Sequence, residues 1–254
     1  NTAVGVFSMI ENTTGNSNTA VGRSSLGSNQ TGASNAAFGR SALTNNTASD
    51  NTALGAFALE DNTSGTRNTA VGLQALANNT TASDNTAVGR QALLANTTGT
   101  NNTSVGKSSL TDNTTASNNT AVGYNCLLAN TGNSNTSVGS IALRYNTSGA
   151  QLTAIGKQAL TANTTGNDNS AMGCDALDAN TTGGSGTAVG RSALGANTTG
   201  NYNVAVGKNA GKSITTGTGH VAIGTFALDA LTTANYNTAC GYQSLGMSTG
   251  SDNT

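Results

Sequence analysis

Apolar residues recur along the chain at two fixed positions of a short repeat. A five-residue motif, N-T-A-V-G, is closed by a glycine at fifteen positions from Gly5 to Gly241, with twelve intervals of 17 residues and two of 16. In the consensus N-T-A-V-G-x-x-A-L-x-x-N-T-T-G-x-x, the residue before the motif glycine is always apolar, and the fourth residue after it is Leu in thirteen copies. Such a fixed period indicates a solenoid, in which each repeat is one coil and like residues stack on like.

Each coil is predicted to contain two short strands. The T-A-V-G segment is β-branched and bounded by glycine, which is typical of a strand, and the x-x-A-L segment is predicted as a second one. Glycine and asparagine interrupt the repeat too often for a helix of about 10–12 residues. The apolar residue before each glycine and the Leu after it are therefore expected to form the core. The predicted fold class is all-β, a parallel β-solenoid or β-roll of fifteen coils of about 17 residues.

Two further columns of the repeat hold only small residues. The residue between Thr and Val is Ala in thirteen copies and Ser at Ser104 and Ser137, and the residue before the Leu position is always Ala, Ser or Cys126. Neighbouring strand residues point to opposite faces, so each large apolar residue has a small neighbour on the other face. A solvated face would accept Lys, Glu or Gln. We therefore expect this second face to be close-packed too, either by the same coil or by another chain.

Asparagine marks the other end of the repeat. It opens the motif in twelve copies and occupies the N-T-T-G segment in twelve. Asparagine tolerates the left-handed conformation of tight turns, and stacked amides can form ladders. Both 16-residue repeats lose a residue in this region, which places the N-T-T-G segment in a surface turn. The repeats fill residues 1–254 as a single array without capping repeats, so we expect a segment of a longer fibre.

Composition narrows the class of protein. Only 8% of the residues are charged, the net charge is −1, and no stretch of about 18 apolar residues occurs. We therefore expect no membrane insertion. We also expect no nucleic-acid partner, because nucleic-acid binding requires a basic footprint.

Residue types that carry enzyme chemistry are sparse. The eleven acidic residues scatter over turn and variable positions, and their closest pairs, Glu60 with Asp61 and Asp175 with Asp178, lack a calcium-loop pattern. His220, the only histidine, replaces a motif-opening Asn, and the three cysteines match no zinc or redox spacing. We predict a protein that is not an enzyme, with no catalytic residue, no cofactor and no metal site.

Basic residues are concentrated in one column of the repeat. Seven of the ten lie immediately after the motif glycine: Arg23, Arg40, Arg90, Lys107, Lys157, Arg191 and Lys208. On a solenoid they form a discontinuous basic stripe along one edge. The stripe either attaches the protein to an acidic surface polysaccharide or keeps an exposed edge soluble and unpaired.

The motif resembles that of a known family. N-T-A-V-G, as in Asn68–Gly72 and Asn85–Gly89, resembles the N-S-V-A-I-G-type motif in the heads of YadA-like trimeric autotransporter adhesins. The tandem array is also similar to those of bacteriophage tail-fibre and related fibre proteins. The resemblance covers the whole chain and implies a homotrimeric, left-handed parallel β-roll on an extracellular, cell or virion surface.

The predicted function is a non-catalytic structural segment of an extracellular or virion-surface fibre, such as an adhesin head, a tail fibre or a surface filament. Its partners would be copies of the same chain and, where it attaches, host-surface glycans or matrix. The alternative is a free-standing solenoid that binds ice through a Thr ladder, because Thr opens the T-A-V-G strand in eleven copies. Parity opposes this alternative, since Thr shares a face with the Val that is expected to be buried. Exposure of the Thr column distinguishes the two.

Several asparagines stand in N-x-[ST] sequons, for example Asn12, Asn62, Asn96 and Asn163. These sequons fall in the N-T-T-G segment. In a compartment that glycosylates proteins, the turn edge would therefore be sugar-coated.

Overall fold

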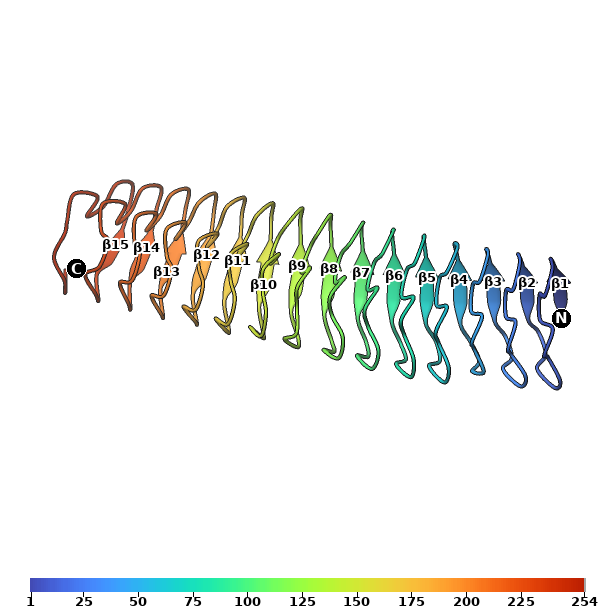
Figure 1. The fold of residues 1–254 in the computed structure, drawn as a ribbon. Coiled ribbons are helices and arrows are strands. Elements are labelled where there is room, and N and C mark those ends of the chain that lie inside the picture. The colour runs from blue at the N-terminus through green and yellow to red at the C-terminus, as the bar shows by residue number, and fades with distance from the viewer. Residues whose placement is uncertain (254) are drawn as a thin grey trace. The chain divides into compact units, whose positions relative to one another are not determined.

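Every coil of the computed structural model, which describes residues 1–253, contributes one three-residue strand, and no helix occurs in that range (Figure 1). The chain forms two compact units, Asn1–Asn125 with β1–β8 and a second from Cys126 onward with β9–β15. Within each unit, successive strands pair in parallel. The predicted parallel β-solenoid with coils of about 17 residues is confirmed.

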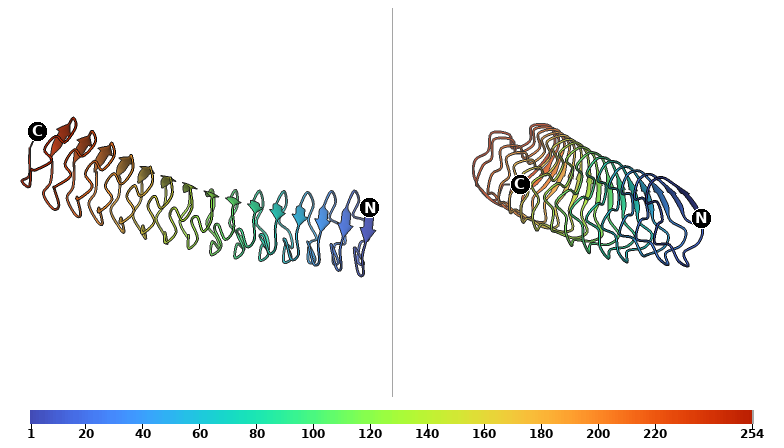
Figure 2. Two further views of the ribbon diagram at one scale, coloured as in Figure 1. Left: turned by 90° about the horizontal axis from the view of Figure 1, so that it is seen from above. Right: turned by 45° about the vertical axis from the view of Figure 1, so that its right-hand side comes forward.

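Strands within each unit pair in register, so that each column of the repeat stacks on itself (Figure 2). In the first unit, Ala70 pairs with Ala87, and Val71 with Val88. The strands of the first unit are β1 (Thr2–Val4), β2 (Thr19–Val21), β3 (Ala36–Phe38), β4 (Thr52–Leu54), β5 (Thr69–Val71), β6 (Thr86–Val88), β7 (Thr103–Val105) and β8 (Thr120–Val122). Those of the second unit are β9 (Thr136–Val138), β10 (Thr153–Ile155), β11 (Ser170–Met172), β12 (Thr187–Val189), β13 (Val204–Val206), β14 (Val221–Ile223) and β15 (Thr238–Cys240).

The small residue in the middle of each strand points into the coil. Ala70 and Ser104 are fully buried, whereas Leu54, which precedes a motif glycine, is 50% exposed. The expectation that the column before the glycine forms the core is therefore wrong. The small column is close-packed as expected, and its own coil does the packing. Buried Leu and Asn side chains occupy the interior of the same coils, which leaves room for only a methyl group or a hydroxyl on the inner face of the strand.

The A-L segment forms tight turns instead of the predicted second strand. In one coil, Gln74 and Leu76 have φ values of 56° and 52°, and the Ala75 N–H donates to the carbonyl of Gly72 at 3.3 Å. Strict alternation of faces holds only for extended backbone. Ala75 and Leu76 can therefore both point inward, and both are fully buried.

The two asparagine columns lie inside the coils and form hydrogen-bonded ladders. Asn79 of the N-T-T-G column donates through Nδ2 to Asn62 Oδ1 at 2.7 Å and to the Ala82 carbonyl at 2.9 Å. Asn68 of the motif-opening column donates to the same carbonyl at 2.8 Å and accepts the backbone N–H of Asn85 at 3.0 Å. The predicted ladders are confirmed. Positive φ falls instead on other positions, such as the residue before the motif-opening Asn.

The motif glycine has a positive φ and a close neighbour in the next coil. Gly72 has a φ of 131°, and a Cβ placed there would lie 2.6 Å from the carbonyl oxygen of Gly89. Both the backbone conformation and the lack of space require glycine at this position.

Candidate functional surfaces

The outer strand face consists of the Thr column and the apolar column of T-A-V, which point away from the coil interior. No member of the apolar column is buried, and Phe38 and Met172 are 39% and 43% exposed. In the first unit the column contains Val4, Val21, Phe38, Leu54, Val71, Val88, Val105 and Val122. In the second it contains Val138, Ile155, Met172, Val189, Val206, Ile223 and Cys240.

Thr hydroxyls on the outer strand face have no hydrogen-bond partner among residues 1–253. Thr side chains of the N-T-T-G turn behave differently, because their hydroxyls donate to the next coil. Thr63 Oγ1 donates to the Thr80 carbonyl at 2.9 Å, and Thr80 Oγ1 donates to the Thr97 carbonyl at 3.1 Å. The parity objection to an exposed Thr ladder therefore fails, since Thr and Val share a face that points outward.

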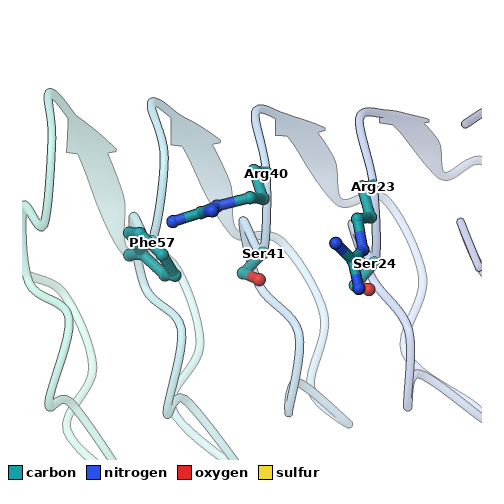
Figure 3. Close-up of a pocket in the computed structure, with 5 residues that line it drawn as sticks. All are labelled: Arg23, Ser24, Arg40, Ser41 and Phe57. Carbon is teal, nitrogen blue, oxygen red and sulfur yellow. The ribbon is translucent and has the colours of Figure 1, made fainter. Parts of the chain in front are cut away.

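The basic stripe lies on the exposed edge that follows each strand. All seven of its residues are exposed. Near its start, Arg23 and Arg40 line a shallow hollow of about 290 Å³ together with Ser24, Ser41 and Phe57 (Figure 3). The Arg40 guanidinium carbon lies 4.4 Å from the centre of the Phe57 ring, so the cation is held over an aromatic face.

Ion pairing within the described residues is limited to Arg67 and Asp84, whose Nε and Oδ1 atoms lie 2.7 Å apart. Hydrogen bonding between these two side chains lowers the pKa of Asp84. Neither Arg67 nor Asp84 belongs to the basic stripe. The stripe residues of the described chain thus have no carboxylate within ion-pair distance.

The closest acidic pairs do not form a metal site. Partial burial raises the pKa of Glu60, and the neighbouring Asp61 raises it further; burial and then Asp175 act on the pKa of Asp178 in the same way. Within residues 1–253, no group of three or more His, Cys, Asp or Glu side chains is placed to hold a metal ion.

His220 occupies the asparagine ladder. Its Nδ1 accepts the Asn237 N–H at 3.2 Å, so Nε2 carries the proton and donates to the Ala234 carbonyl at 2.7 Å. Burial lowers the pKa of His220. The residue therefore reproduces the two hydrogen bonds of the Asn that it replaces.

The three cysteines lie in different environments: Cys126 is buried, Cys174 is half-buried and Cys240 is exposed. The Cys126 thiol takes a small-residue position of the interior and lies 3.0 Å from the Ser137 hydroxyl. A hydrogen bond to Asp175 raises the pKa of Cys174. A raised pKa disfavours the reactive thiolate.

The sequons of the N-T-T-G column lie inside the ladder. Asn62, Asn96 and Asn163 are fully buried, and the Nδ2 atom that would carry a sugar donates two hydrogen bonds in each of them. The expected sugar coat at these asparagines is therefore incompatible with the folded chain.

The alternation of strand residues predicts that Thr and Val share one face of the strand, but this face was expected to be buried. Parity correctly groups Thr with Val and opposes both to Ala, yet it does not say which face is inside. The aromatic partner of Arg40 was also missed, although Phe57 follows it by one repeat. Adding the repeat length to each stripe position would have found it.

No family model, curated protein or solved structure matches this chain. Among residues 1–253, no helix long and apolar enough to cross a membrane is present.

Proposed function

We propose that this chain is a non-catalytic structural segment of an extracellular or virion-surface fibre, and that its outer strand face packs against other copies of the chain. One observation carries the proposal. The apolar column contains no polar residue in fifteen coils, although all of its members lie on the surface of the single chain. Soluble monomers seldom expose a continuous apolar strip, so its retention supports a covered face.

Variation within the apolar column also favours a protein interface. Phe38, Leu54 and Met172 interrupt a run of Val with side chains of different volume. A packed interface accommodates such changes with complementary changes in the partner. The unpartnered Thr hydroxyls could then form hydrogen bonds across the interface. The homotrimeric, left-handed arrangement of adhesin heads and tail fibres is the assembly that we propose.

Stiffness is the mechanical contribution of the repeat. Within each unit, backbone hydrogen bonds connect successive coils, as with Leu76, whose N–H donates to the Ala92 carbonyl at 2.9 Å, and the asparagine ladders add to them where Asn is present. Each coil adds about 4.8 Å, the spacing between neighbouring strands. Repetition therefore sets the length of a stiff element without any catalytic group.

Solution mass by light scattering, measured on the whole chain refolded at several concentrations, tests the association. We expect the mass of three chains. Val71→Lys, which places a charge on the outer strand face, should shift the mass to that of one chain. Leu73→Lys is the control, since Leu73 is an exposed apolar residue on the edge after the glycine, outside the outer strand face, whereas Val71 is half-buried on that face. A folded monomer at every concentration would contradict the proposal.

Ice binding is the second candidate, and the free hydroxyls of the strand Thr residues favour it. Five consecutive coils, β4–β8, present Thr at this position: Thr52, Thr69, Thr86, Thr103 and Thr120. If the chain is a monomer, inhibition of ice recrystallisation is the next measurement. Thr86→Lys should abolish it, whereas Thr98→Lys in the exposed turn should not.

A further inference from the structure

Pairs of cations on successive coils recur on the edge that follows the strands, and an aromatic residue on the third coil completes each set. We call these sets the basic–aromatic clusters. Two lie in the first unit and one in the second: Arg23, Arg40 and Phe57; Arg90, Lys107 and Tyr124; and Arg191, Lys208 and Phe226. We propose that these clusters bind an acidic polysaccharide, one that carries carboxylate or sulfate groups.

In every cluster the second cation lies over the aromatic ring. The Arg40 guanidinium carbon is 4.4 Å from the ring centre of Phe57, Lys107 Nζ is 5.6 Å from that of Tyr124, and Lys208 Nζ is 5.9 Å from that of Phe226. A cation held over a ring loses less freedom when it binds an anion. The donor edge of a stacked guanidinium stays open to a carboxylate or sulfate.

No cluster cation forms an ion pair within the described residues, although Glu60 lies close enough to Arg40 for this cation to counter part of the rise that burial and Asp61 cause in the pKa of Glu60. Like charges on neighbouring strands oppose each other, and successive coils are only about 4.8 Å apart. The only ion pair in the described residues involves Arg67 and Asp84, so no cluster cation has a carboxylate within 4.0 Å. A bound anionic group between two such cations would relieve the repulsion.

Polar side chains beside the cations suit a sugar. Ser24 and Ser41 follow Arg23 and Arg40, line the same hollow and have no hydrogen bond through their hydroxyls (Figure 3). The other clusters have amides or hydroxyls at the same positions: Gln91, Ser108, Ser192 and Asn209. Each cluster thus offers charge for an acidic group and hydrogen-bonding groups for ring hydroxyls.

A nucleic acid fits these clusters less well. The first unit has five basic and six acidic residues, so it lacks the positive field that attracts a phosphate backbone. The cation over each ring also covers a face on which a base would stack. Between Arg40 and Arg90 the stripe carries Ala56 and Leu73. Such spaced sites suit a long flexible polymer that binds several clusters at once.

Retardation of the whole chain in native gels that contain polygalacturonate or chondroitin sulfate, with dextran as the neutral reference, tests this proposal. The cluster variant Arg40→Gln/Lys107→Gln/Lys208→Gln removes the stacked cation from every cluster. The control variant Arg67→Gln/Lys157→Gln/Lys212→Gln removes three exposed charges outside the clusters, including a stripe lysine whose neighbouring stripe positions are Ser140 and Cys174. We expect the cluster variant to bind about tenfold more weakly or worse, and the control variant to bind as the wild type does.

Phe57→Ala/Tyr124→Ala/Phe226→Ala keeps every charge and should weaken binding about threefold through loss of the stacked geometry. Equal losses in the cluster and control variants, or no retardation by either acidic polysaccharide, would overturn the proposal. Tighter binding to single-stranded oligothymidylate would overturn it as well. The clusters lie outside the outer strand face, so binding by a monomeric chain would contradict the proposed association and leave this inference standing.

Discussion

The two units are built from the same repeat, but only the first keeps both asparagine columns intact. In the second unit, the motif-opening column carries three substitutions and the N-T-T-G column three more: Leu152, Gly186, His220, Ile214, Leu231 and Ser248. These columns are buried and hydrogen-bonded. Each substitution therefore leaves donors and acceptors that would otherwise form hydrogen bonds with an Asn side chain. The second unit therefore indicates which changes the interior tolerates.

Two of these substitutions show how the ladder accommodates a change, one by reproducing the hydrogen bonds and one by redirecting them. His220 bonds to Asn237 and Ala234 as a ladder Asn would. Ile214 removes the donor that Asn197 Oδ1 would have had, and Asn203 Nδ2 approaches that oxygen instead at 3.4 Å. Leu231 replaces Asn in the following coil, so Ile214 and Leu231 are consecutive members of the N-T-T-G column. Two apolar side chains therefore lie next to each other, and neither faces an Asn amide of the other coil.

The outer strand face differs between the units as well. Thr occupies its column in seven of eight coils of the first unit and in four of seven of the second, where Val204 and Val221 are among the replacements. The apolar column is complete in both units. The proposed association through this column can thus involve both units, whereas the Thr column is interrupted more often in the second unit.

Breaking a ladder in the first unit should have the largest effect on stability. Asn79→Leu removes a donor from Asn62 Oδ1, an acceptor from Asn96 Nδ2 and one of two donors from the Ala82 carbonyl. We expect the free energy of unfolding to fall by about 2–4 kcal/mol, measured by urea denaturation. Asn78→Leu is the control, because the exposed neighbour makes no side-chain hydrogen bond and should change stability by less than about 0.5 kcal/mol. Equal effects would place the stabilising contribution outside the ladder.

Restoring the consensus in the second unit requires two changes at once. Gly211 stands where other coils have Leu, and a Cβ there would lie 2.9 Å from Ile214 Cδ1 and 3.1 Å from Leu194 Cδ2. Gly211→Leu alone should therefore overpack the interior and cost about 1–3 kcal/mol. Adding Ile214→Asn removes the obstructing side chain and returns a donor to the ladder, so the pair should recover most of the loss. Strictly additive free energies in this double-mutant cycle would show that the two positions do not compensate for each other.

The sequence predicts the coils of this fold better than it predicts their orientation. Period, parallel stacking, buried Leu and asparagine ladders all follow from the columns. The inner face of the strand was misassigned because large apolar residues are ordinarily buried, and Val was preferred to Ala for that reason. The narrow coil made by the A-L turns determines which face of the strand points inward. Those turns depend on positive φ at residues such as Gln74 and Leu76, which no local sequence signal marks.

The candidate surfaces were predictable to different degrees. The basic stripe follows directly from one column, and the structure places its residues on an exposed edge. The hollow beside Arg40 needs the side chain of Phe57 from the next coil, so it becomes visible only when neighbouring repeats are aligned. The outer strand face depends on the orientation that the sequence left unresolved.

A pH-dependent difference between the units should follow from His220. Burial lowers its pKa below the ordinary value of 6.5, so the unfolded chain takes up a proton at this residue more readily than the folded chain does. The histidine therefore causes no loss of stability above about pH 6.5, and stability falls as the pH drops through the lowered pKa. Urea denaturation at pH 7.5 and pH 5 should show a larger fall for the wild type than for His220→Asn. An identical fall in both proteins would exclude His220 as its source.

Returning the polar pairs of the small columns to alanine should change stability least. Ser104 Oγ donates to the Ser109 carbonyl at 2.9 Å and contacts the Ser109 hydroxyl, and in the second unit Cys126 Sγ lies 3.0 Å from Ser137 Oγ. Ser104→Ala/Ser109→Ala and Cys126→Ala/Ser137→Ala each remove both side chains of a hydrogen-bonded pair and should change the free energy of unfolding by less than about 0.5 kcal/mol. Larger losses would mean that these pairs stabilise the interior beyond what alanine provides. If both double variants leave the free energy of unfolding unchanged, the small-residue columns behave alike in the two units. The difference between the units would then lie in the asparagine columns, where only the second unit carries substitutions.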